Sequence, residues 1–265
     1  MNLRERVDRF FIAQFEGLPL DQADEMDILE ANGTVNFGSN KAYRAMLKKI
    51  KAGSPATNPD DLQYILDNVD VDNLFEYMAL EMFVGNSDIG NIRYYRLHQE
   101  GSKWKWIWYD ADYGLYSSKF NSPWSYLKVK GMGEQKIDNT IFLKLLEHPD
   151  YKRKFLEKLA DVYKTFTTEY MTQVLDGVLA EIQPEMKNHW ERWGELNDKA
   201  VTSEVPTTID GAYTYWESRV NRLYNTLKVR PHRLWDFIKD EFKLTKTEME
   251  ELFGPQPDYP DDAVL

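Results

Sequence analysis

The sequence contains no cysteine, and it also lacks long hydrophobic runs. The missing thiols exclude disulfide bonds, zinc–thiolate centres and a cysteine nucleophile. No stretch approaches the roughly 20 consecutive apolar residues that a membrane-spanning helix needs. The sequence therefore predicts a chain without a membrane span, whose chemistry depends on oxygen and nitrogen side chains.

Positive charge is the second shortage. The chain has 33 Lys and Arg against 44 Asp and Glu, a formal net charge of −11. Duplex DNA and anionic membranes both require a basic surface, so neither is expected as the main partner. Cationic protein substrates remain compatible with this charge. A hydrophobic fraction of 42% over 265 residues excludes a disordered chain and is enough for one large domain or two small ones.

Several common catalytic motifs are also missing. The four histidines are scattered and form no His-x-x-x-His pair, which argues against a zinc hydrolase. The sequence has no G-x-G-x-x-G, no G-x-x-x-x-G-K-[ST] and no G-x-S-x-G. Rossmann, P-loop and serine-hydrolase sites are therefore unsupported, and metal–phosphate chemistry is the main class left.

The pattern of apolar residues predicts a mainly helical α+β protein. Helices are expected at 40–52, from Pro59, and from a cap at Asp70 or Asp72 to Gly85. Residues 21–31 read as a short acidic segment before an Asn-Gly turn. Strands from Ile92 to Leu97 and from Lys103 to Tyr109 predict a small antiparallel hairpin. After Thr140 a helical bundle is expected, with helices at 140–147, 149–165, 168–183, 184–194, 208–228, 231–241 and 245–252, before a turn-rich tail.

Polar residues gather at two points of this pattern. Asp88 and Asn91 follow an apolar helix, and Asp110 and Asp112 follow the hydrophobic strand from Trp104. If the second segment stays extended, Asp110 and Asp112 point to the same face. Two carboxylates suit Mg²⁺ with phosphate oxygens, and a nearby Asp and Asn complete the usual set for phosphoryl transfer. The alternative is that Asn86, Asp88 and Asn91 are only turn and cap residues.

Three longer segments resemble the spore coat protein H (CotH) kinase family. They read DILEANGTVNFGSNKAYRAMLKKI, VDVDNLFEYMALEMFVGNSDIGNIRYYR and KWKWIWYDADYGLY. Downstream, FLKLLEHPDYKRKFLEKLAD, IQPEMKNHWERW and Arg230-Pro231 resemble it in the same order. The resemblance implies the large lobe of an atypical, secretory-type protein kinase. Such enzymes transfer the γ-phosphate of ATP to Ser or Thr of proteins with Mg²⁺ or Mn²⁺.

The resemblance also implies roles for five residues. Asp88 resembles the catalytic-loop aspartate, and Asn91 the loop asparagine that binds nucleotide and metal. Asp110 and Asp112 resemble the metal-binding D-x-D, and Glu5 a glutamate near the nucleotide at the end of the small lobe. The loop SDIGNI is shorter than the form common in the family, and Asp112-Tyr-Gly is similar to the D-F-G of ordinary kinases.

The expected domain spans residues 1–253. Within it, 1–31 would be a remnant of the small lobe and its connection, 32–139 the catalytic core with the metal site, and 140–253 the helical bundle. Residues 254–265 would be a tail or linker. The strands that carry the phosphate-binding lysine are expected to be missing, which would weaken activity. The family implies a bacterial cell surface, extracellular or spore-coat setting, although Met1–Arg9 contains no signal-type segment.

Two other functions remain open at this point. One is a kinase-like binding module of a cell surface or spore coat that has lost catalysis. The other is a glycosyltransferase, because a strand ending in D-x-D also suits Mn²⁺ and a nucleotide diphosphate. That class needs a βαβ unit before the motif, and residues 40–85 read as helices instead. For the kinase, the net charge favours basic, Ser-containing protein substrates.

Overall fold

The N-terminal half of the chain is built on a four-stranded antiparallel sheet with the strand order β2-β1-β3-β4. The computed structural model describes residues 6–128, 137–197, 206 and 208–261. The strands are β1 (Met26–Glu30), β2 (Thr34–Phe37), β3 (Arg93–Leu97) and β4 (Lys105–Ile107). The hairpin predicted within residues 92–109 is confirmed as β3 and β4, but the sheet has two further strands.

Strand β1 was not predicted, because an acidic residue interrupts its hydrophobic pattern. Asp27 is the second residue of this central strand and is only 4% exposed. Its carboxylate accepts a hydrogen bond of 2.7 Å from the backbone N–H of Ser39 and lies 3.1 Å from Nε2 of His98. Because these partners come from other segments, the buried charge is compensated in a way that local sequence does not reveal.

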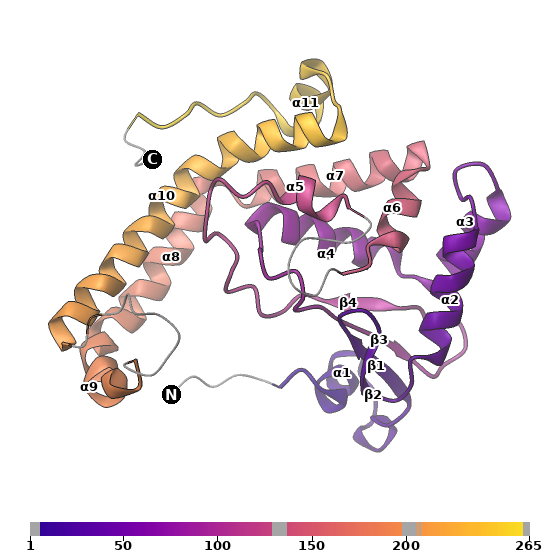
Figure 1. Cartoon of the computed structure of the whole chain (residues 1–265), viewed down its shortest axis with the longest axis horizontal. Helices are drawn as coiled ribbons and strands as arrows, with labels where there is room; N and C mark the ends of the chain where they lie inside the picture. Colours follow the sequence, from indigo (N-terminus) through magenta and orange to yellow (C-terminus); the bar gives the residue numbers. More distant parts are fainter. Residues whose placement is uncertain (1–5, 129–136, 198–205, 207, 262–265) are drawn as a thin grey trace.

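The remaining elements are helical and cover both faces of the sheet: α1 packs against the side of Met26 and Ile28, and most of the other helices lie on the side of Leu29 (Figure 1). Helix α4 is central to them: ten of its 14 residues are buried, and it packs against α5, α7 and β4. We call residues 110–114, which carry Asp110 and Asp112, the acidic turn. The helices before it are α1 (Arg9–Phe15), η1 (Leu20–Gln22), α2 (Lys41–Ala52), α3 (Pro59–Asn68) and α4 (Val71–Val84). Those after it are α5 (Ser122–Tyr126), α6 (Thr140–Leu146), α7 (Pro149–Thr165), α8 (Thr168–Ile182), η2 (Gln183–Glu185), α9 (Met186–Asn197), α10 (Ile209–Phe242) and α11 (Lys246–Phe253).

Helix α10 corrects the prediction of a break near Pro231. The structure contains one helix of 34 residues with Pro231 inside it. Proline has no N–H, so the carbonyl of Leu227, four residues earlier, loses its usual helical partner. The hydroxyl of Thr168 donates a hydrogen bond of 3.0 Å to that carbonyl. A side chain from α8 thus satisfies the acceptor, and the helix continues.

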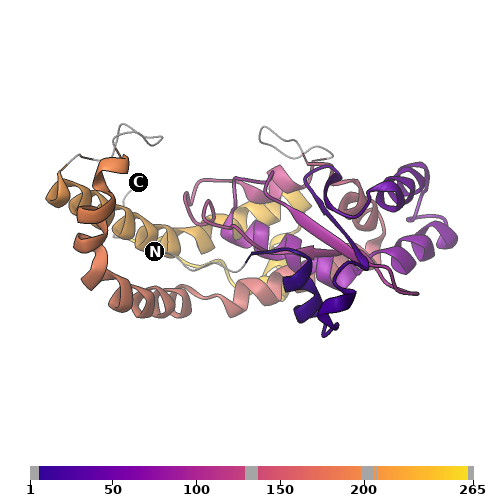
Figure 2. The same ribbon diagram turned by 90° about the horizontal axis from the view of Figure 1, so that it is seen from below.

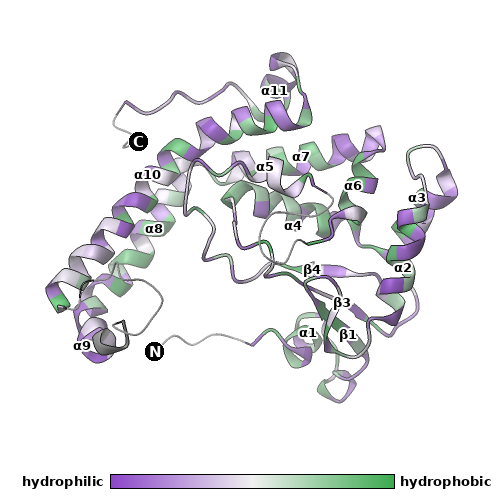
Figure 3. Ribbon diagram, viewed as in Figure 1, coloured by the Kyte–Doolittle hydropathy of each residue, from purple (hydrophilic) through white to green (hydrophobic). Residues whose placement is uncertain are grey.

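Helices α8 and α9 and the first half of α10 form an arm that projects from the body (Figures 1 and 2). No residue of α8 is buried. Tyr170, Val174, Val178 and Ile182 follow one another at four-residue spacing and are 41–49% exposed. Hydrophobic colouring recurs along α8 in Figure 3. Among the described residues, no helix has both the length and the apolar character needed to cross a bilayer.

Candidate active site

The loop that carries Asp88 begins where α4 ends. Gly85 ends the helix in the left-handed conformation, with φ 64°, which favours glycine. Three residues further on, the backbone N–H of Asp88 donates a hydrogen bond of 3.0 Å to Oδ1 of the buried Asn86. Asp88 itself is exposed. The loop is therefore fixed at its base while the carboxylate of Asp88 faces solvent.

Arg230 supports this end of α4 from the C-terminal half of the chain. Its guanidinium is buried and donates hydrogen bonds of 2.8 Å to the carbonyl of Met82 and 2.6 Å to that of Phe83. It also donates to the carbonyl of Phe120 and to Oγ of Ser122. Burial lowers the pKa of Arg230 to about 10, so the side chain stays charged at neutral pH. The carbonyls at a helix C-terminus carry partial negative charge, which favours this cation.

Glu81 connects the same loop to the residues that follow β4. It is 1% exposed, and its Oε2 accepts a hydrogen bond of 2.6 Å from the hydroxyl of Tyr126. Burial raises the pKa of Glu81, and the charge of Asp88 raises it further. Hydrogen bonds from Tyr126, Asn86 and Trp108 act in the opposite direction. Glu81 therefore forms hydrogen bonds with both Asn86, at the base of the Asp88 loop, and Trp108, which follows β4.

Asn91 brings the two predicted polar segments together. Its Nδ2 donates a hydrogen bond to Oδ2 of Asp110. The hydroxyl of Tyr109 donates to Oδ1 of Asn91 at 3.2 Å. Burial raises the pKa of Tyr109, which keeps this hydroxyl protonated. The loop after α4 and the turn after β4 consequently form one polar surface.

Asp110 and Asp112 were expected to point to the same face if their segment stayed extended. The segment is not extended, so this condition is not met. Strand β4 ends at Ile107, and Asp110 has a φ of 53°. The alternation of side chains along a strand therefore does not apply here. Asp112 lies in a turn in which the N–H of Gly114 donates to the carbonyl of Ala111 at 2.8 Å. No described hydrogen bond joins Asp112 to Asp110 or Asn91.

Gly114 lets this acidic turn pack directly against the end of α4. A Cβ at this position would lie 2.8 Å from the carbonyl oxygen of Ala111 and 3.0 Å from a methyl group of Val84. The next residue, Leu115, donates a backbone hydrogen bond of 2.6 Å to the carbonyl of Val84. The turn with Asp112 and the loop with Asp88 are thus both anchored at the same helix terminus.

The charges of this surface are uncompensated. Asp88, Asp110 and Asp112 are exposed, and within the described residues none of them forms an ion pair with Lys, Arg or His. The described residues also contain no cluster of three or more His, Asp or Glu side chains in metal-binding geometry. The possible metal ligands are carboxylate and amide oxygens, which suit Mg²⁺ when phosphate or water supplies the other ligands. Glu5 lies outside the described residues.

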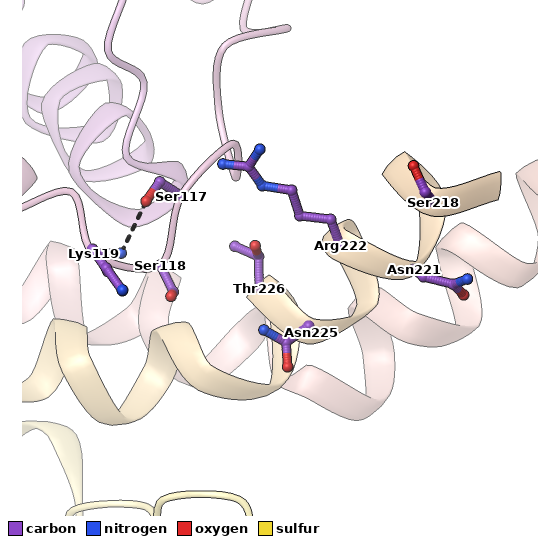
Figure 4. A pocket seen from close by; sticks show the side chains of 8 residues that line it. All are labelled: Ser117, Ser118, Lys119, Ser218, Asn221, Arg222, Asn225 and Thr226. Carbon is purple, nitrogen blue, oxygen red and sulfur yellow. Dashed lines mark hydrogen bonds between the residues drawn. The ribbon is translucent and has the colours of Figure 1, made fainter. Parts of the chain in front are cut away.

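A cavity of about 500 Å³ lies beside the acidic turn and was not predicted. Its lining comes from two segments about 100 positions apart, which meet only in the fold (Figure 4). The lining residues are Ser117, Ser118, Lys119, Ser218, Asn221, Arg222, Asn225 and Thr226. No local sequence motif marks these positions.

Comparison with known proteins agrees with the resemblance noted in the sequence. A family model described as "CotH kinase protein" matches residues 14–234, which include Asp88, Asn91, Asp110 and Asp112 but not Glu5. No curated protein and no solved structure matches the chain. The family model covers well over half of the 265 residues. The chain therefore belongs to the CotH kinase protein family.

Proposed function

We propose that the protein is a protein kinase that transfers the γ-phosphate of ATP to Ser or Thr hydroxyls of protein substrates. The hydrogen bond between Asn91 and Asp110 is the observation that supports this most directly. It joins the loop with Asp88 to the acidic turn, as a phosphoryl-transfer site requires. On this proposal residues 32–139 form the catalytic core of a kinase-like large lobe, and 140–253 its helical bundle.

The proposed roles combine the family resemblance with the positions of these residues. Asp88 is exposed on a loop with a fixed base, and it orients the acceptor hydroxyl and takes its proton. The hydroxyl oxygen forms a bond to the γ-phosphorus while the bond from that phosphorus to the oxygen of the ADP leaving group breaks. Asn91, Asp110 and Asp112 would hold Mg²⁺ or Mn²⁺, which when bound neutralises phosphate charge. Glu5 and Asn91 are the proposed contacts to the nucleotide.

The substrate class follows from charge. The chain carries a net charge of −11, so long-range attraction favours Lys- and Arg-rich segments. Basic peptides that contain Ser are therefore the proposed acceptors. Because salt screens this attraction, the preference over acidic peptides should narrow as ionic strength rises.

The fold disfavours one alternative function. A nucleotide-sugar transferase of the D-x-D type needs a βαβ unit before its motif. The fully described segment from Lys41 to Val84 instead forms three consecutive helices, α2, α3 and α4. The other alternative, a binding module without catalysis, is distinguished from the kinase by measuring phosphate incorporation.

The test is the incorporation of radiolabelled phosphate from ATP into a basic, Ser-containing peptide. Asp88→Asn should lower the rate by at least about 10²-fold, the usual contribution of a general base. Asp161→Asn removes the same charge from an exposed position on α7 and should leave the rate unchanged. Circular dichroism checks that both variants are folded. Equal incorporation by wild type and Asp88→Asn would remove Asp88 from the catalytic role, and no incorporation by wild type would favour the binding module.

A further inference from the structure

The cavity beside the acidic turn has an unusual lining for an acidic protein. All eight of its lining residues are polar or basic, and none of them is an acid. Lys119 comes from the segment after the acidic turn, and Arg222 comes from α10. In Figure 4, Arg222 and Thr226 extend from α10 toward the segment that carries Ser117 and Ser118. Two cations and six hydroxyl or amide side chains therefore surround one space.

The two cations are available for a ligand. Within the described residues, neither Lys119 nor Arg222 forms an ion pair, and neither side chain donates a hydrogen bond to a protein acceptor. The guanidinium of Arg222 lies over the ring of Tyr116, with its carbon 4.3 Å from the ring centroid. A guanidinium stacked in this way keeps its in-plane N–H donors, which suit a planar carboxylate or a phosphate.

The lining also excludes other ligand classes. A metal cation is disfavoured, because the cavity carries two positive side chains and no carboxylate. An apolar ligand would find no apolar side chain in the lining. Two cations with several hydroxyl and amide donors match a doubly charged anion with three acceptor oxygens. The volume of about 500 Å³ is in the range of ligand pockets and far exceeds a phosphate group alone.

We propose that this cavity is a binding site for a phosphate monoester, supplied by a phosphorylated Ser or Thr side chain of a peptide. Lys119 and Arg222 bind the phosphate oxygens, and the hydroxyls of Ser117 and Ser118 donate to them. The remaining volume accepts the residues next to the phosphorylated one. The site uses none of the residues assigned to phosphoryl transfer, so it stands or fails independently of the proposed kinase activity.

The test is the binding of a fluorescent phosphoserine peptide, measured by anisotropy without ATP. The same peptide with unmodified Ser and inorganic phosphate are the comparison ligands. The phosphopeptide should bind at least about tenfold more tightly than the unmodified one, because only its phosphate can form charge-assisted hydrogen bonds with Lys119 and Arg222. Lys119→Gln/Arg222→Gln should lose this preference. Asp88→Asn should keep it.

The matched control is Arg44→Gln/Lys48→Gln, which makes the same charge change at exposed positions on α2. It should keep the preference for the phosphopeptide. If the Lys119 and Arg222 double variant does not fold, Lys119→Gln alone and Arg222→Lys should each weaken phosphopeptide binding. Equal binding of both peptides, or the same loss in the α2 control, would overturn the site. If inorganic phosphate displaced the fluorescent peptide at the same concentration as the unlabelled phosphopeptide does, the assignment of the cavity to a peptide ligand would be overturned.

Discussion

Asn91 donates a hydrogen bond from its side-chain nitrogen to a carboxylate oxygen of Asp110, 19 positions later in the chain. This contact unites two segments that are each anchored at the end of α4, one through Gly85 and the other through Leu115. The carbonyl oxygen of Asn91 accepts from Tyr109, so both ends of the amide are held. The geometry therefore fixes the relative placement of loop and turn before any ligand binds.

The first prediction concerns metal and nucleotide. Mg²⁺ or Mn²⁺ with ATP should raise the melting temperature, since a ligand at 100 times its Kd stabilises by about 2.7 kcal/mol. Asp112→Asn should abolish the shift and leave the unliganded protein folded, because Asp112 is exposed and forms no described hydrogen bond. Asp161→Asn should retain the shift. A shift that persists in Asp112→Asn would remove this residue from the metal site, and a shift with UDP-sugars alone would favour the glycosyltransferase.

The second prediction concerns the support of the Asp88 loop. A Cβ at Gly85 would lie 2.5 Å from Nη2 of Arg230, and its φ of 64° is already unfavourable for alanine. Gly85→Ala should therefore lower the free energy of unfolding by about 3–5 kcal/mol, measured with urea. Gly101→Ala is the control, because Gly101 also has a positive φ but no atom within 4 Å of a new Cβ. It should lose only about 1–2 kcal/mol. Equal losses of unfolding free energy in Gly85→Ala and Gly101→Ala would show that the Arg230 side chain moves aside without an energetic cost.

The third prediction concerns the proline within α10. Thr168→Val removes the hydroxyl that donates to the carbonyl of Leu227, and should cost about 1–3 kcal/mol of unfolding free energy. Pro231→Ala supplies a backbone N–H to the same carbonyl. In the Pro231→Ala background, Thr168→Val should therefore cost much less. A double-mutant cycle measures this difference, and additive losses would disprove the compensation.

The fourth prediction concerns alkaline pH. Burial raises the pKa of Tyr43 to about 12, compared with about 10 in an unfolded chain. The folded state binds the proton of the Tyr43 hydroxyl more tightly than the unfolded state does. The contribution of Tyr43 to the free energy of unfolding is therefore fully present below pH 10 and is lost as the pH rises toward 12. Tyr43→Phe should reduce the decline by up to about 2–3 kcal/mol, measured by urea unfolding at successive pH values. The exposed Tyr170→Phe is the control. Parallel declines in wild type and Tyr43→Phe would contradict the prediction.

Helix boundaries were the most predictable part of the fold, because their signals are local. Asn58 caps α3 before Pro59, Asp70 caps α4, and Thr245 and Glu248 form a capping box at the start of α11. The errors arose where the deciding partner is distant in sequence. Pro231 does not end α10, because Thr168 on another helix satisfies the freed carbonyl.

The contact between the two polar segments was predictable from the sequence, and the geometry of the acidic turn was not. The residue types and their order indicated that Asn91 and Asp110 would meet, and they do. The relation between Asp110 and Asp112 could not be predicted, because it depends on a single left-handed residue at the end of a strand. The cavity with Lys119 and Arg222 could not be found either, since it exists only where α10 passes the segment after the acidic turn.

Arg230 also determines when the site can be completed during synthesis. Its hydrogen bonds reach carbonyls 147 and 148 positions earlier in the chain. At roughly 5–20 residues per second, a ribosome needs about 7–30 s to add that many residues. Throughout this interval the end of α4 has been synthesised, but the guanidinium of Arg230 that binds its carbonyls has not. The Asp88 loop therefore reaches its final support only when the C-terminal part of the chain has emerged and docked.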